Sequence, residues 1–115
     1  MIKTREVALR GPFPSGALVH AVLVSFRANA SLEQREQIVS QYQRLGETCG
    51  GTKEGILFWQ AGLNLDQRKN WHIVQFSIFK DNAALQRFRA HAAHAKLSEI
   101  MSPIADWAVG DIEIP

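Results

Sequence analysis

The sequence predicts an α+β domain with the ferredoxin-like order βαββαβ, in which one antiparallel sheet carries both helices on a single face. Two observations predict this class. A chain of 115 residues with 46% hydrophobic and 21% charged residues has the size and composition of one soluble globular domain. Segments with strand and helix periodicity also follow one another in that order.

The start of the chain differs in composition from the rest. Residues 1–16 include the run Gly11-Pro12-Phe13-Pro14-Ser15-Gly16. Its prolines remove backbone donors and its glycines add conformational freedom, so we expect a mobile or surface-draped extension. The domain itself is then expected to span residues 17–115.

The first strand is predicted over Leu18 to Arg27, which is rich in β-branched and apolar residues. One of its faces carries His20, Val22, Val24 and Phe26, and the other carries Val19, Ala21, Leu23 and Ser25. Ser31 and Gln34 have the spacing of a capping box, which predicts the start of the first helix. Apolar residues then recur at helical spacing until Gly46.

Two strands are predicted after this helix. Glu47 to Gly55 contains two adjacent glycines and is expected to be a loop, and Ile56 to Leu63 follows as the second strand. Asn64 to Asn70 is polar and turn-like. Trp71 to Phe79 is the third strand, with His72, Val74, Phe76 and Ile78 on one side.

A second helix is predicted after Asp81 or Asn82, either of which can cap its start. Its apolar pattern continues through Met101 and ends before Pro103. A last strand fits Trp107 to Ile114, which completes the βαββαβ order.

Two predicted strands are apolar or weakly polar on both faces. Neither Leu18 to Phe26 nor Trp71 to Phe79 alternates cleanly with charged residues, so the face away from the helices needs a cover. The simplest cover is the same face of a second copy. We therefore predict an isologous homodimer.

Charge and cysteine content exclude several classes of protein. The formal net charge of +2 comes from 13 basic and 11 acidic residues spread along the chain, with no block that predicts binding to nucleic acid or to a membrane surface. Cys49 is the only cysteine, which excludes an intramolecular disulfide. The longest apolar stretch, Ala17 to Phe26, is about half of a membrane span, and we find no signal-peptide cleavage site. We expect a cytoplasmic protein.

The four histidines are the candidate functional residues, because histidine is the side chain that most readily exchanges a proton near neutrality. His91 and His94 are three residues apart on a predicted helix, which places both rings on nearby parts of one surface. We expect them to line one cavity. The alternative is that one caps or packs against a helix end while the other is solvated.

His20 and His72 each share a strand face with valines and a phenylalanine, so we expect both to point to the helix-covered side. The alternative is a structural histidine bonded to a backbone carbonyl. We expect no metal, because antiparallel pairing places the starts of the first and third strands up to roughly 20 Å apart. No carboxylate has a recognisable ligand spacing with these histidines.

These segments resemble the stress-responsive A/B barrel (Dabb) domains, a family of dimeric α/β barrels. The resemblance runs from about His20 to Ile114. It is carried by the opening strand, by Gly62-Leu63-Asn64-Leu65, by Trp71-His72-Ile73-Val74 and above all by His91-Ala92-Ala93-His94. Ala92 departs from the family, which usually has proline there. The resemblance implies a cavity beneath the helices of each subunit and a sheet-to-sheet dimer.

Some Dabb proteins are similar to cofactor-independent polyketide cyclases, and the resemblance carries their site residues over by position. The implied catalytic residues are His94, His20, His72 and Tyr42. The implied ligand-binding residues are His91, Phe88 and Trp71, although tryptophans here are otherwise expected in packing and dimer contacts. Phe88 stands where the cyclases have a tyrosine, and a phenyl ring cannot hydrogen-bond a carbonyl oxygen.

The sequence and the resemblance therefore favour two functions. The first is a homodimeric Dabb protein whose His-lined cavity binds a small organic ligand, with no cofactor, and with structural histidines if it is not catalytic. The alternative is a polyketide-cyclase-like enzyme in which His94 removes a proton α to a carbonyl, His20 or His72 polarises that carbonyl, and Tyr42 donates to the developing oxygen.

Overall fold

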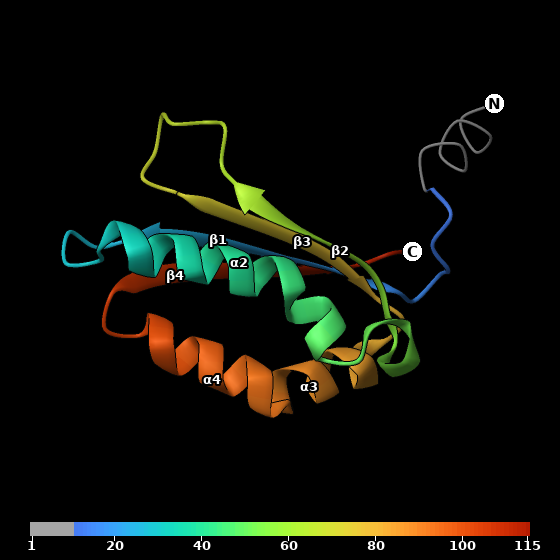
Figure 1. The fold of residues 1–115 in the computed structure, drawn as a ribbon. Helices are drawn as coiled ribbons and strands as arrows, with labels where there is room; N and C mark the ends of the chain where they lie inside the picture. The colour runs from blue at the N-terminus through green and yellow to red at the C-terminus, as the bar shows by residue number, and fades with distance from the viewer. Residues whose placement is uncertain (1–10) are drawn as a thin grey trace.

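The computed structural model describes residues 11–115 and confirms the ferredoxin-like α+β fold. Its elements, in chain order, are β1 (Leu18–Phe26), α2 (Leu32–Thr48), a 3₁₀ turn η1 (Gly51–Glu54), β2 (Ile56–Leu63), β3 (Ile73–Phe79), α3 (Asn82–Ala90), α4 (Ala92–Met101) and β4 (Ala105–Glu113). The strands form one antiparallel sheet in the order β2-β3-β1-β4. The α-helices all lie on one face of it (Figure 1).

Helix α2 begins at the predicted capping box but extends beyond the predicted end. The Gln34 amide donates to Ser31 Oγ at 3.1 Å, and the Ser31 amide donates to Gln34 Oε1 at 2.8 Å. The helix passes Gly46, where an added Cβ would lie 2.6 Å from the Trp59 ring. Gly46 therefore lets Trp59 pack closely, and the helix ends only where Gly50 adopts a left-handed φ of 108°.

The second predicted helix is in fact two helices. His91 lies between α3 and α4 with an extended backbone, φ −66° and ψ 138°. Its ring Nδ1 accepts a hydrogen bond from the Ala93 amide at 3.0 Å, so His91 caps the start of α4. The apolar pattern continues across this break, which is why periodicity alone predicted one helix.

The register of β1 and β3 decides which side chains face the helices. His20 is opposite Ser77 and Val22 is opposite Gln75, so the odd-numbered residues of β3 lie on the helix-covered face. The expectation that the even-numbered residues of β3 share this face with His20 is wrong, although His72, which precedes β3, lies beside Phe26 and lines a hollow with residues of α2. The even-numbered side of β3, which includes Phe76, lies on the face without helices.

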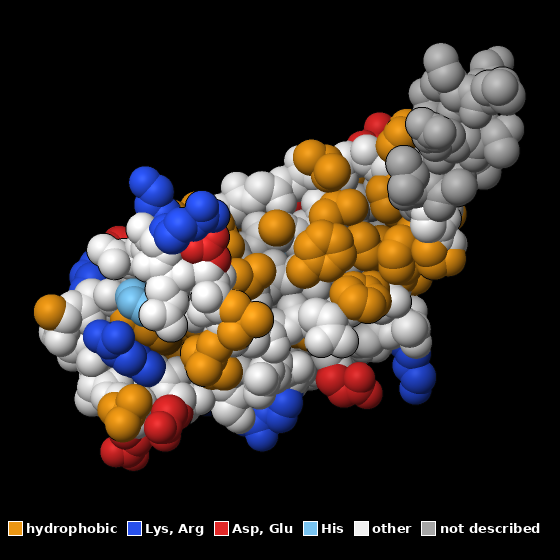
Figure 2. Space-filling model, turned by 90° about the horizontal axis from the view of Figure 1, so that it is seen from above, with side chains coloured by type: hydrophobic (Ala, Val, Ile, Leu, Met, Phe, Trp, Pro, Cys, Tyr) orange, Lys and Arg blue, Asp and Glu red, His pale blue; other side chains and the backbone are white. Residues whose placement is uncertain are grey.

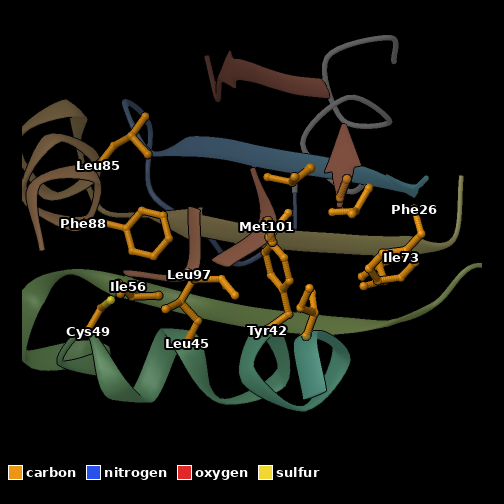
Figure 3. Close-up of a cluster of buried hydrophobic side chains, with 14 of the residues drawn as sticks. Phe26, Tyr42, Leu45, Cys49, Ile56, Ile73, Leu85, Phe88, Leu97 and Met101 are labelled. Atoms are coloured by element: carbon orange, nitrogen blue, oxygen red, sulfur yellow. The ribbon is translucent and has the colours of Figure 1, made fainter. Parts of the chain in front are cut away.

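Apolar side chains fill the space between the sheet and the helices. Phe26, Tyr42, Leu45, Ile73, Phe88, Leu97 and Met101 belong to this cluster (Figure 3). They come from two strands and all three α-helices. The core therefore holds the layer of helices on the sheet and determines how much room is left beneath them.

The other face of the sheet carries an apolar surface. By register it includes Val19, Ala21, Leu23, Phe58, Phe76 and Ile112, and Figure 2 shows hydrophobic side chains gathered over this face. Phe76 is 42% exposed and packs edge-on to Phe58, with ring centroids 6.0 Å apart. The surface is therefore large, aromatic and open in the single chain.

Part of the predicted N-terminal extension is visible. Residues 1–10 lie outside the described residues. Within 11–16, the Phe13 ring lies 6.2 Å from the Phe58 ring, and the Gly16 amide donates to the Ile114 carbonyl at 2.8 Å. This short segment therefore lies against the sheet. Among the described residues, no helix has the length and apolar character needed to cross a membrane.

Candidate functional site

A small polar cavity lies between the sheet and the helices. His20 on β1, Tyr42 on α2, Gln75 on β3, and His94 and Ser98 on α4 supply its polar side chains. The apolar remainder of its wall comes from Val22, Leu45, Trp59, Phe88 and Leu97. Its volume is about 20 Å³, which is enough for one water molecule or one ligand oxygen.

His20 is held by a carboxylate on the neighbouring strand. The residue is 3% exposed, and its Nδ1 lies 2.6 Å from Asp111 Oδ1. Asp111 Oδ2 in turn accepts from the Arg89 guanidinium at 2.7 Å. A carboxylate at Nδ1 favours the tautomer in which Nδ1 carries the proton, so Nε2 is left as the reactive nitrogen of His20.

Gln75 is the one group of this cavity whose polar atoms are buried without protein partners. Its side chain is fully buried, and neither Nε2 nor Oε1 has a hydrogen-bond partner among residues 11–115. An unpaired buried donor or acceptor costs about 1–3 kcal/mol. The amide is satisfied when a group in the cavity donates a hydrogen bond to Oε1 and accepts one from Nε2.

The electrostatic environment keeps two cavity side chains neutral near pH 7. Burial lowers the pKa of the half-buried His94 below its ordinary value, and the charges of His20 and Arg89 lower it further. His94 can therefore accept a proton. Burial raises the pKa of Tyr42 to about 12, so its hydroxyl keeps its proton and can act as a hydrogen-bond donor.

Phe88 fills most of the space in which the resemblance implies a larger cavity. Its ring centroid lies 4.8 Å from that of His94, 5.1 Å from Phe79, 5.4 Å from Trp59 and 5.9 Å from His20. Figure 3 shows the ring pointing inward over the sheet. As described, the cavity admits a functional group but not a whole organic molecule.

His72 and Trp71 do not join this cavity. His72 immediately precedes β3. It lies five positions from Ser77, the residue that pairs with His20, and this spacing separates the two histidines by about 16 Å along the strand. Its Nδ1 accepts from the Phe26 amide at 2.9 Å. Both residues line a different hollow near the start of α2.

His91 is also separate from His94. In addition to capping α4, it lines a cavity of about 140 Å³ together with Cys49 and Phe88. Of the residues expected in one site, the structure brings together His20, Tyr42, Phe88 and His94. Gln75 and Asp111 were not predicted as site residues, because a polar residue on a strand gives no local sign of the face it occupies.

No metal centre is evident in the part of the chain that the structure describes. Residues 11–115 contain no group of three or more His, Cys, Asp or Glu side chains placed to hold a metal ion.

The fold and this cavity define a small ferredoxin-like α+β domain in which a buried histidine, His20, pairs with a carboxylate. The model of the family described as Stress responsive A/B Barrel Domain matches residues 18–114. The chain therefore belongs to this family, Dabb, as the resemblance implies. Comparison with curated proteins found no match.

Solved structures of similar fold include two bacterial proteins of unknown function, both described as dimeric and ferredoxin-like. The one from Thermobifida fusca has a TM-score of 0.75 at 14% identity, with 90% of this chain and 95% of the other covered. The one from Bacteroides fragilis has a TM-score of 0.71 at 21% identity, with 89% and 99% covered. A hydroxynitrile lyase from Passiflora edulis has a TM-score of 0.72 at 18% identity, with 89% and 96% covered.

Proposed function

We propose that this protein binds a small organic molecule that places an oxygen-bearing group in the polar cavity between His20, Gln75 and His94. The unpaired amide of Gln75 is the observation that carries this proposal. A hydroxyl oxygen both donates and accepts, so it satisfies Gln75 better than a carboxylate, which only accepts. The neutral His94 and the Tyr42 hydroxyl favour the same uncharged group.

A groove between α2 and α4 offers room for the rest of this molecule. It has a volume of about 330 Å³ and includes Gln41, Thr48 and Lys96. Leu45 and Leu97 line both this groove and the polar cavity. We therefore propose that these two side chains act as a gate, whose rotation joins the two spaces.

Acid and base catalysis without a cofactor is the second candidate function, and the His20–Asp111 pair favours it. In this reaction His94 removes a proton from a hydroxyl group or from a carbon next to a carbonyl. The proton moves to the imidazole. When it comes from the carbon, the C–H electron pair forms an enolate; when it comes from the hydroxyl, the O–H electron pair forms a carbonyl as a leaving group departs from the same carbon with its bonding pair. Tyr42 donates to the oxygen on which charge develops. The similar fold of a hydroxynitrile lyase supports chemistry at a hydroxyl-bearing carbon.

We also propose that two copies pair through the open faces of their sheets. The aromatic surface around Phe58 and Phe76 supports this, as do the dimeric proteins of similar fold. Burial of this surface would leave the helix side of each subunit, where the polar cavity lies, uncovered.

A ligand screen by thermal unfolding tests the binding proposal. Small alcohols and carbonyl compounds that bind are expected to raise the unfolding temperature by mass action. The Gln75→Met variant should lose these shifts, whereas Gln37→Met, an exposed glutamine on α2, should keep them. Equal shifts in both variants would remove Gln75 from the site.

The catalytic proposal has its own test. Carbonyl compounds found in the screen should exchange their α-protons with deuterated solvent, as followed by NMR. His94→Ala should stop the exchange while the protein stays folded and dimeric. Exchange at the unmodified rate in His94→Ala would exclude His94 as the base and leave only ligand binding.

A further inference from the structure

A larger hollow of the described chain is lined by residues other than those of the polar cavity. It lies between the first half of α2 and the β2–β3 connection, and its volume is about 680 Å³. Pockets for small organic ligands usually have volumes of about 300–1,000 Å³. His20, Gln75 and His94 do not line it. We call it the α2-loop groove.

The wall of the α2-loop groove includes large apolar side chains. They are Phe26, Leu32, Val39, Leu63 and Trp71. Leu32 is 73% exposed and Leu63 is 67% exposed, which is unusual for leucines that face a common hollow. An apolar ligand body would remove this surface from water.

A fixed positive charge lies against this apolar wall. Arg35 is half-buried, its Nε donates to the Ala30 carbonyl at 3.1 Å, and one terminal nitrogen donates to the Arg27 carbonyl at 3.3 Å. Its Cζ lies 5.2 Å from the centre of the Phe26 ring. These contacts orient the guanidinium, yet within residues 11–115 no carboxylate forms a salt bridge with it.

Two further groups add to the attraction for an anion. Lys69 lies on the loop side of the groove. The charged residues that line the groove are therefore two cations, Arg35 and Lys69, and one carboxylate, Glu36. The His72 ring accepts a hydrogen bond at Nδ1, so in its neutral form the proton is on Nε2, which is a donor. The net charge of +1 fits a singly charged ligand better than a phosphate dianion.

We propose that the α2-loop groove binds an amphipathic monocarboxylate, with the carboxylate at Arg35 and Lys69 and the apolar chain or ring against Leu63, Val39 and Trp71. This site is separate from the proposed polar cavity and takes a ligand of a different chemical class. Its position on the helix side of the sheet keeps it independent of the proposed dimer face.

Octanoate and 1-octanol test the proposal, since they share an alkyl chain and differ in charge. The sequence has three tryptophans, and Trp71 is the one that lines the groove. We expect octanoate to shift the Trp71 indole N–H signal in a two-dimensional NMR spectrum, with the signal assigned from Trp71→Phe. Octanol should bind at least about tenfold more weakly, which corresponds to roughly 1.4 kcal/mol.

Variants locate the charge that selects the carboxylate. Arg35→Gln should weaken octanoate binding at least about tenfold and leave octanol binding unchanged. Arg35 also donates hydrogen bonds to two backbone carbonyls, so its replacement changes the fold as well as the charge. Lys69→Gln is therefore a second variant, on an exposed side chain. Its matched control is Lys80→Gln, which removes the same charge from an exposed lysine outside the groove.

Three results would overturn the proposal. One is octanoate that leaves the Trp71 signal unshifted at millimolar concentration. Another is equal affinity for octanoate and octanol. The third is a loss of octanoate binding in Lys80→Gln that matches the loss in Lys69→Gln, since that would indicate general charge attraction rather than a site.

Discussion

The Nδ1 atom of His20 lies 2.6 Å from Oδ1 of Asp111, although 91 residues separate them in sequence. The two residues are direct partners in the pairing of β1 with β4. Arg89, from α3, holds the second oxygen of the same carboxylate. One carboxylate therefore links two strands and a helix at the wall of the polar cavity.

Replacement of Asp111 should lower the stability of the fold, because it breaks this link between the strands and the helix. Asp111→Asn keeps the size of the side chain but removes the charge that holds Arg89 and His20. We expect the free energy of unfolding in urea to fall by about 1–2 kcal/mol, since hydrogen bonds to charged groups contribute more than neutral ones. In ¹⁵N NMR spectra, the His20 ring should also lose its preference for a proton on Nδ1.

Asp106→Asn is the matched control, because Asp106 pairs with Arg27 on the surface, where the two side chains are 65% and 47% exposed. Exposed ion pairs contribute about 0–1 kcal/mol, so this variant should be close to the unmodified protein. An Asp111→Asn variant no less stable than Asp106→Asn would contradict the structural role of the His20–Asp111 pair.

Gln75→Met tests whether the unpaired side-chain amide of Gln75 lowers the stability of the protein without ligand. Methionine has a similar length and no polar atoms to leave unpaired. We expect the free energy of unfolding without ligand to stay equal or to rise by up to about 1–3 kcal/mol, as measured by urea unfolding. A clear loss of stability would mean that Gln75 already has good partners within the fold, and the case for a ligand oxygen would fail.

The stability of the protein should depend on the protonation of His94. Burial lowers the pKa of His94 in the folded protein below 6.5, so between that lowered pKa and 6.5 the unfolded chain binds more protons. The free energy of unfolding should therefore fall as the pH is lowered from 7 through this window. His94→Asn should show a weaker fall. A folded-state His94 that titrates at or above 6.5 by NMR would contradict this account.

The proposed dimer depends on the aromatic side chains of the open sheet face. Phe76→Glu places a charge in the centre of this surface, and we expect monomers in size-exclusion chromatography with light scattering. Leu65→Glu serves as the comparison, since Leu65 is 95% exposed but lies in the β2–β3 connection. If Phe76→Glu stays dimeric, or if the unmodified chain is a monomer, the sheet-face dimer is wrong.

The fold could be predicted from the sequence because its signals are local. The Ser31 and Gln34 pair lies within one helical turn and stabilises the start of α2 wherever the helix packs. The bounds of β2 were likewise visible as an apolar run. The break at His91 was not visible, because a histidine that caps α4 with its ring has the same spacing as one within a continuous helix.

The site could be predicted only in part, because it depends on register and on pairs distant in sequence. His20 faces the helices as expected, yet the pairing of β1 with β3 places Gln75, not the even-numbered residues of β3, beside it. The partner of His20 lies on the last strand. Neither the burial of Gln75 nor the contact with Asp111 has a local pattern that could reveal it.

A crystal structure at a resolution that shows ordered water tests the central claim most directly. We predict electron density for a water molecule, or for the oxygen of a bound ligand, within hydrogen-bond distance of the Gln75 amide and facing His94. A dry cavity would contradict the claim, as would a Gln75 side chain whose amide is fully paired with other groups of the protein.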